Sequence, residues 1–163
     1  VIVLPTDHYP YGLERSATWQ NTSDYLRELY GVEDYDRVIR DHNALIIWSG
    51  CLEDMDIVVE DPVSALDVLP TLSNLFGLEY DSRFLVGRDV FSISCPLVVW
   101  KDRSWMTTMG YYDGTRNVFT PNEGVSVSDQ YIETVKAIVQ NKFAYSRAFH
   151  NYDLLRLVFG ETD

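Results

Sequence analysis

The chain opens with a short apolar run, residues 1–4, which leads to an adjacent carboxylate and imidazole, Asp7 and His8, at a proline-containing bend. Neighbouring residues in an extended strand point to opposite faces of a sheet, so these two side chains can bind one ion only if the backbone turns at the pair. Pro10 and Gly12 favour that turn, because proline keeps the preceding residue extended and glycine accepts positive φ. The segment therefore predicts a strand that ends in a pair of candidate metal ligands.

A carboxylate and an imidazole suit a divalent cation such as manganese or zinc. The dipeptide alone is not specific, because the sequence repeats it at Asp41-His42. The second copy lies in a polar run, residues 36–43, and since charged residues are usually exposed we expect it to be solvated surface. For Asp7 and His8 two interpretations stay open: a metal site, or an ordinary hydrogen-bonded pair.

The composition limits the classes of function. With 163 residues and 46% hydrophobic content, the chain can fold around a core as one domain, or as one domain with a small annex. Its net charge of −12, from 25 acidic and 13 basic residues, argues against a nucleic-acid partner and gives no attraction to an anionic membrane surface. No apolar run approaches the roughly 20 residues that span a bilayer, so we expect a soluble chain without a membrane segment.

Two further features concern the start of the chain and its thiols. The first residues already have the pattern of a strand interior, so we expect the chain to be a fragment of a longer protein. Cys51 and Cys95 are too few for a disulfide scaffold and too far apart in sequence for a zinc knuckle. We expect buried free thiols, and the sequence leaves open whether the two pair.

The first half of the chain predicts both strands and helices. Residues 22–24 form a cap for a short helix that Gly31 ends. Residues 44–48 are a continuous apolar run, which fits a strand covered on both faces as in an α/β sheet. Residues 56–60 predict another short strand.

The clearest helix pattern in the sequence covers residues 63–77. Ser64 and Asp67 are candidate N-terminal caps, Pro70 fits the first turn, and Gly77 is placed to end the helix. The spacing of its large apolar residues predicts a buried stripe made of Leu69, Leu72, Leu75 and Phe76.

The second half predicts a small antiparallel sheet followed by helices. Strand-like runs at residues 96–100, 104–109 and 116–120 are separated by turns at residues 101–103 and 113–115. Ser128-Asp129 then precede a long amphipathic helix, and residues 152–159 predict a last short one. Four aromatic residues of this region either expose a surface for sugars or a partner, or fill a thin core, which we favour because each buries a large area: Trp100, Trp105, Tyr111 and Tyr112.

Three stretches of the sequence, taken together, resemble the C-terminal part of a sulfatase-type domain of the alkaline phosphatase superfamily. They are residues 1–12, with the strand and the Thr-Asp-His signature; residues 45–50; and residues 64–89, with Leu-Asp-Val-Leu-Pro-Thr-Leu, Phe76-Gly77 and Gly87-Arg88-Asp89. The chain looks most like the lipoteichoic acid synthase group of phosphoglycerol transferases. The resemblance covers about the first half of the chain, and the remainder resembles that group only in layout.

The resemblance implies an α/β fold. Residues 1–93 would be the C-terminal part of an alkaline-phosphatase-like α/β sandwich, and residues 94–163 a small antiparallel β subdomain with a packed C-terminal helix. We expect Asp67, Pro70 and Gly77 to shape a helix that packs under the sheet rather than to touch substrate.

In the family, the Asp-His pair supplies two ligands to a catalytic divalent ion, and these map onto Asp7 and His8. Manganese is the usual ion in the synthases, with zinc, magnesium or calcium as alternatives. The nucleophilic Thr and a further acidic ligand lie earlier in the family's sequence, so no catalytic residue is expected in this chain, and Thr6 is not assigned as the nucleophile. The turn after the pair borders the substrate pocket, which makes three residues candidates for substrate binding: Tyr9, Tyr11 and Gly12. Their identities differ from the synthase pattern, which leaves the substrate open.

The implied parent protein is a bacterial enzyme anchored by membrane helices, with this region on the extracellular face, and it serves the cell wall. It would take phosphoglycerol from a lipid head group through a covalent phospho-threonine. With two protein ligands instead of the usual minimum of about three, the chain alone should bind metal weakly and be inactive. Two alternatives stay open: a sulfate-ester or phosphodiester hydrolase of the same superfamily, and a non-enzymatic carbohydrate- or partner-binding module. The donor and acceptor, the number of metals and the oligomeric state also stay open.

Overall fold

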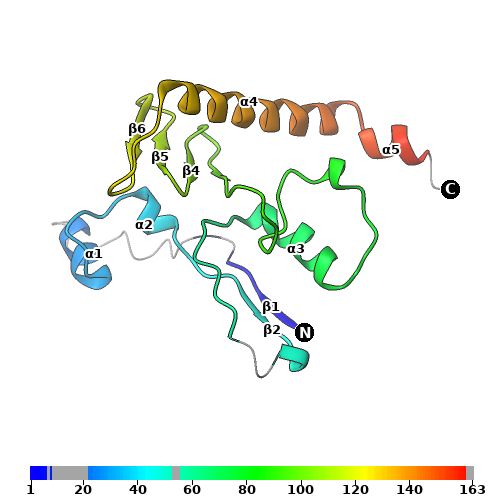
Figure 1. Ribbon diagram of the computed structural model, residues 1–163, viewed down its shortest axis with the longest axis horizontal. Helices are drawn as coiled ribbons and strands as arrows, with labels where there is room; N and C mark the ends of the chain where they lie inside the picture. Colours follow the sequence, from blue (N-terminus) through cyan, green and yellow to red (C-terminus); the bar gives the residue numbers. More distant parts are fainter. Residues whose placement is uncertain (7, 9–21, 53–55, 161–163) are drawn as a thin grey trace. The chain divides into compact units, whose positions relative to one another are not determined.

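The computed structural model describes residues 1–6, 8, 22–52 and 56–160, drawn in colour in Figure 1. The chain forms two compact units, Val1–Ile57 and Val58–Asp163. Both contain helices, and each has its own antiparallel sheet, so the expected mixed α/β class is confirmed. The alkaline-phosphatase-like sandwich and the expected boundary between residues 93 and 94 stay predictions.

The first unit contains a two-stranded antiparallel sheet. Strand β1 (Ile2–Leu4) pairs with β2 (Ile46–Trp48), and Ile2 lies opposite Trp48 while Leu4 lies opposite Ile46. The run at residues 44–48 thus contains the predicted strand. Its expected cover on both faces is wrong for the described residues, because Ile46 and Trp48 are 54% and 50% exposed.

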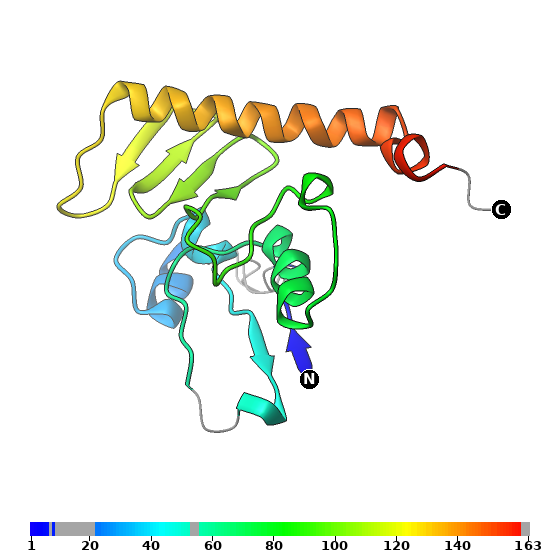
Figure 2. The same ribbon diagram turned by 45° about the vertical axis from the view of Figure 1, so that its right-hand side comes forward.

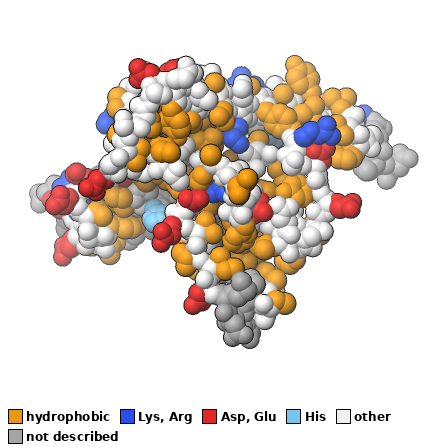
Figure 3. Space-filling view, in the orientation of Figure 1, with side chains coloured by type: hydrophobic (Ala, Val, Ile, Leu, Met, Phe, Trp, Pro, Cys, Tyr) orange, Lys and Arg blue, Asp and Glu red, His pale blue; other side chains and the backbone are white. Residues whose placement is uncertain are grey.

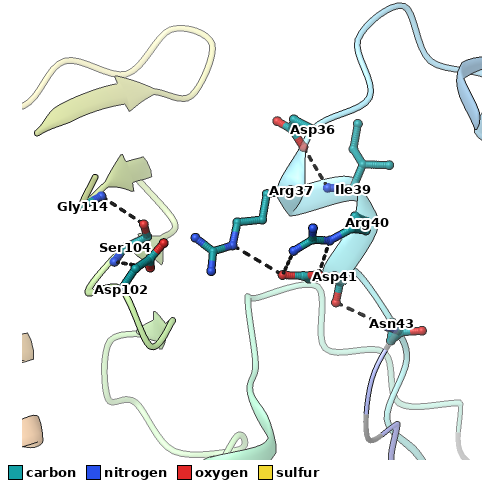
Figure 4. Close-up of polar contacts among 9 residues, drawn as sticks. All are labelled: Asp36, Arg37, Ile39, Arg40, Asp41, Asn43, Asp102, Ser104 and Gly114. Carbon is teal, nitrogen blue, oxygen red and sulfur yellow. Dashed lines mark hydrogen bonds and ion pairs between the residues drawn. The ribbon is translucent and has the colours of Figure 1, made fainter. Parts of the chain in front are cut away.

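In the described part of the segment between these strands, the chain forms two α-helices. Helix α1 (Thr22–Tyr30) ends as predicted at Gly31, whose φ is +66° and whose N–H donates to the Glu28 carbonyl. Helix α2 (Arg37–Asp41) was not predicted, and Asp36 caps it by accepting a hydrogen bond from the Ile39 N–H at 2.9 Å (Figure 4). An aspartate at the N-cap position satisfies an N–H that the helix itself leaves unpaired.

The two cysteines correct another expectation. Cys51 lies in a short 3-10 helix, η1 (Gly50–Leu52), and Cys95 lies in the second unit. Both are free thiols and both are exposed, so the expected burial is wrong.

The second unit begins with the predicted helix. A 3-10 turn, η2 (Ala65–Asp67), runs into α3 (Val68–Leu75), and Pro70 lies in the first turn as expected. After the helix, Gly77 has φ +62° and donates to the Asn74 carbonyl at 3.0 Å, while Leu78 donates to the Ser73 carbonyl at 2.8 Å. This pair of bonds is the Schellman motif, for which glycine is the favoured residue.

The predicted buried stripe of α3 is wrong. Leu69, Leu75 and Phe76 are 58%, 46% and 52% exposed, and Leu72 is only half-buried. The buried side chains of this helix are instead Pro70, Thr71 and Ser73. The helix therefore packs through a largely polar face, and apolar side chains contribute much of the visible surface (Figure 3).

The predicted strand at residues 56–60 is also wrong. These residues belong to no strand of the described structure, and Val58 is 78% exposed. Valine and isoleucine favour strands chiefly where a neighbouring strand pairs with them and packs on their side chains, and neither is present here.

A four-stranded antiparallel sheet follows, in the order β3-β4-β5-β6. It confirms the predicted small sheet. The strands are β3 (Val98–Val99), β4 (Trp105–Thr107), β5 (Gly110–Asp113) and β6 (Val118–Pro121). Strand β5 was not predicted, because it begins at a glycine, which is depleted in strands, and its last residue, Asp113, was assigned to the turn at residues 113–115. It lies close to β6: a Cβ on Gly110 would be 2.3 Å from the Thr120 carbonyl oxygen.

The long helix α4 (Asp129–Asn151) lies along the sheet, and α5 (Leu154–Phe159) follows it (Figure 2). Ser128 caps α4 as predicted, because its hydroxyl accepts a hydrogen bond from the Tyr131 N–H at 3.2 Å. The core between sheet and helix consists of Trp105, Tyr112, Val135 and Val139. Trp105 and Tyr112 stack with ring centroids 5.2 Å apart, which confirms that these two aromatics fill a core.

Candidate functional site

Of the predicted site residues, the structure places His8. Asp7, Tyr9, Tyr11 and Gly12 lie outside the described residues. His8 follows the end of β1, and its side chain is exposed. Just before it, the Thr6 hydroxyl donates a hydrogen bond to the Ala44 carbonyl at 3.3 Å, which ties this end of β1 to the residues that precede β2. The imidazole is therefore accessible, on a segment that the small sheet anchors.

The second Asp-His pair has a different environment. The Asp41 carboxylate accepts hydrogen bonds from Arg40 at 2.8 and 3.3 Å and lies 3.6 Å from Nε of Arg37 (Figure 4). Its side chain is only 21% exposed, whereas His42 is exposed, so the expected solvated surface holds for the histidine alone. Two guanidinium groups compete with any cation for this carboxylate.

Among the residues that the structure describes, no group of three or more His, Cys, Asp or Glu side chains could hold a metal ion. Of the predicted ligand pair, His8 belongs to these residues and Asp7 does not.

Polar groups of residues 64–90 form one connected assembly. Asp67 is 3% exposed, and its carboxylate accepts hydrogen bonds from the Ser64 N–H at 2.9 Å and from the Arg88 N–H at 2.8 Å. The Ser64 hydroxyl adds a third contact at 3.3 Å. Burying a carboxylate is costly unless donors of this kind surround it, and here three polar groups do so.

Thr71 extends the assembly from the first turn of α3. Its hydroxyl donates to the Asp67 carbonyl at 2.6 Å and accepts from the Val90 N–H at 3.1 Å. One turn further along the helix, the Asn74 amide donates to the Asp89 carboxylate at 2.8 Å. We call these residues the Asp67 latch: Ser64, Asp67, Thr71, Asn74 and residues 87–90.

Gly87 has no side chain, which allows the backbone of the Asp67 latch to approach Leu66 closely. A Cβ at this position would lie 1.9 Å from the Leu66 carbonyl oxygen, closer than any side chain can approach. Asp67, Gly87, Arg88 and Asp89 thus take part in contacts within residues 64–90, and the scaffold role expected for Asp67 stays a prediction.

Two side chains of helix α4 form hydrogen bonds with the loop that precedes residues 87–90. Nζ of Lys142 donates to the Val86 carbonyl, and the Tyr145 hydroxyl donates to the Arg83 carbonyl. Burial lowers the pKa of Lys142 below its ordinary value, and the negative charge of Asp67 partly offsets this effect. A partly buried ammonium beside the latch therefore joins α4 to residues 82–86.

Sequence reasoning missed a cavity of about 210 Å³ between the four-stranded sheet and α4. Its lining residues come from two sheet turns, one strand and one helix, so no local sequence pattern marks them. They are Asp102, Arg103, Tyr112, Gly114, Lys136, Val139 and Gln140.

The comparisons with known proteins do not identify a relative. No family model matches the sequence, and no curated protein or solved structure is significantly similar to it. Within the described part of the chain, none of the helices combines the length and apolar character that crossing a membrane requires.

Proposed function

We propose that the chain is part of a divalent-metal-dependent phosphoglycerol transferase of the sulfatase type, in which Asp7 and His8 supply two metal ligands. The observation that carries this proposal is the exposed imidazole of His8, directly beyond β1 on a segment anchored by the Thr6 hydrogen bond. The Asp67 latch gives secondary support, because it joins the two ends of the stretch, residues 64–89, whose sequence resembles that domain.

The chemistry of the donor pair fits the ion that the resemblance implies. Imidazole and carboxylate together favour manganese or zinc, whereas magnesium and calcium prefer oxygen ligands. When bound, such an ion would stabilise negative charge on the transferring phosphoryl oxygens and lower the pKa of the attacking hydroxyl. The role of Asp7 and His8 is to bind and orient the ion, and Tyr9, Tyr11 and Gly12 would border the substrate.

The proposal places the nucleophilic Thr and the remaining ligands in polypeptide beyond these 163 residues, on the extracellular face of a bacterial membrane. The substrate would then be a lipid-linked phosphoglycerol. A hydrolase of sulfate esters or phosphodiesters would use the same two ligands, and the acceptor distinguishes the two activities: water for a hydrolase, a glycerol hydroxyl for a transferase.

Manganese binding tests the ligand pair directly. The chain has three histidines, and paramagnetic Mn²⁺ broadens the NMR signals of the imidazole that it contacts. We expect the His8 signals to broaden at a lower Mn²⁺ concentration than those of His42 and His150, and Asp7→Asn to remove this difference.

The second Asp-His pair provides the matched control. Asp41→Asn makes the same chemical change beside His42, where arginines bind the carboxylate, and should leave the broadening of His8 unchanged. Equal broadening of His8 and His42 in the unmodified chain would contradict the metal assignment.

Activity of the purified chain tests the placement of the nucleophile. We expect no product from phosphodiester or sulfate-ester substrates even with excess Mn²⁺, because two ligands and no nucleophile do not make a catalytic centre. Metal-dependent turnover by the chain alone would show that the nucleophile lies within it.

A further inference from the structure

The cavity between the four-stranded sheet and α4 has an apolar floor and a polar rim. Tyr112 and Val139 are 5% and 1% exposed and form the floor. Asp102 and Arg103 come from the turn between β3 and β4, and Gly114 follows β5. Lys136 and Gln140 stand one helical turn apart on α4 and complete the rim.

Hydrogen bonds fix the rim in place. The Asp102 carboxylate accepts a hydrogen bond from the Ser104 N–H at 3.1 Å, and the hydroxyl of Ser104 accepts one from the Gly114 N–H at 3.0 Å (Figure 4). Arg103 has a left-handed backbone, with φ +67°, which is uncommon for a residue other than glycine. Its guanidinium carbon lies 5.5 Å from the ring centroid of Phe143. The two sheet turns are thus held together before any ligand binds.

The charges at the rim balance one another. Nζ of Lys136 lies 2.7 Å from the carboxylate of Glu133, and the lining also contains one acidic and one basic residue, Asp102 and Arg103. The rim therefore offers both donors and acceptors without an excess of positive charge. A hydroxyl group matches such a rim, because it donates and accepts hydrogen bonds at once, whereas an anion would need a surplus of donors.

We propose that this cavity binds a neutral polyol, of the size of one sugar ring. Hydroxyl groups of the polyol exchange hydrogen bonds with Arg103, Gln140 and Asp102, and its C–H groups lie on Tyr112 and Val139. The volume of about 210 Å³ is below the range of roughly 300–1,000 Å³ found for sites of drug-sized ligands, which favours a single ring over a longer chain. Neither Asp7 nor His8 is among its lining residues, so this proposal does not rest on the metal assignment.

Titration of the full chain with defined probes, followed by backbone and side-chain amide NMR, tests the site. The neutral probes are glycerol, glucose and N-acetylglucosamine, and glucose 6-phosphate is the anionic one. We expect a neutral probe to shift the signals of the Gly114 N–H and the Gln140 amide in a saturable way, with a dissociation constant in the millimolar range.

Two variants and a control assign the binding to the rim. Arg103→Ala and Gln140→Ala each remove hydrogen bonds to the polyol and should weaken binding about tenfold. Both side chains are exposed, so the fold is expected to persist, and unchanged signals elsewhere in the spectrum verify this. Arg147→Gln changes an exposed residue of α4 that does not line the cavity, and should leave the affinity unchanged.

Three results would overturn the proposal. They are the absence of saturable shifts with every neutral probe up to its solubility limit, tighter binding of glucose 6-phosphate than of glucose, and equal affinities for the unmodified chain and both rim variants.

Discussion

The carboxylate of Asp67 accepts a hydrogen bond at 2.8 Å from the backbone N–H of Arg88, a residue 21 positions further along the chain. The same carboxylate accepts a bond from the Ser64 N–H, and it is almost completely buried. One side chain thus satisfies the backbone at the start of η2 and at the end of a long loop. The segment between Ser64 and Arg88 therefore folds back on itself without forming a sheet.

Replacing Asp67 tests the energetic weight of this contact. Asp67→Ala leaves two partly buried backbone N–H groups without this acceptor, and we expect it to lower the free energy of unfolding by about 2–3 kcal/mol. Asp67→Asn should cost less, because its carboxamide oxygen can still serve one donor. Urea denaturation measures both, and Asp61→Asn at an exposed position is the control. A loss for Asp67→Ala no larger than that of the control would contradict the role of the latch.

Gly87 and Gly77 require glycine for different reasons: the first for lack of space, the second for its backbone conformation. At Gly87 a Cβ would collide with the Leu66 carbonyl, so Gly87→Ala should destabilise the chain by about 3 kcal/mol or more. At Gly77 the space is open but φ is +62°, so Gly77→Ala should cost only about 1–2 kcal/mol. The midpoints of urea denaturation of the two variants should differ in that order. The reverse order would show that the 66–87 contact can relax.

The stability contribution of Lys142 should depend on pH in a defined direction. Burial lowers its pKa below 10.5, so between the lowered value and 10.5 the unfolded chain binds more protons at this site than the folded chain. Stability therefore rises with pH across that window. Denaturation curves from neutral pH to pH 10.5 should show the unmodified chain gaining stability relative to Lys142→Met.

Lys136 is the matched control for this experiment. Its hydrogen bond to Glu133 raises its pKa, so its contribution is present below 10.5 and is lost only as pH rises through the higher folded value. Lys136→Met should therefore show no such gain below 10.5. A difference between the unmodified chain and Lys142→Met that stays constant with pH would contradict the partial burial of Lys142.

Trp105 should tolerate one substitution far better than another. Trp105→Ala opens a void beside Tyr112 and should cost about 3–5 kcal/mol. Nε1 of Trp105 is buried and has no hydrogen-bond partner among the described residues. Trp105→Phe removes this unpaired N–H while keeping a stacked ring, and should cost only about 1 kcal/mol. Thermal or urea unfolding of the two variants checks the difference, and equal losses would refute it.

The helix ends were predictable from the sequence because they depend on local chemistry. Ser128 and Gly77 act through hydrogen bonds within a few residues of themselves, so their identities were sufficient. The small sheet was predictable for a similar reason, since its turns separate the strands. Only β5 was missed, because it begins at Gly110 and its last residue was assigned to a turn.

The burial of individual side chains was less predictable, because it depends on which distant segments of the chain pack against each helix or strand. Leu69 and Phe76 have helical spacing, yet Thr71 and Asp67 draw residues 87–90 to the other side of α3 and leave these apolar side chains exposed. The residues of the cavity under α4 come together through the sheet topology. No spacing in the sequence records that arrangement.

The two exposed thiols have a practical consequence. Cys51 belongs to the first compact unit and Cys95 to the second, and both thiols are free and exposed. A donor and an acceptor dye attached to this natural pair would report the separation of the two units by energy transfer in solution. The natural cysteines therefore allow this distance to be measured without introducing new labelling sites.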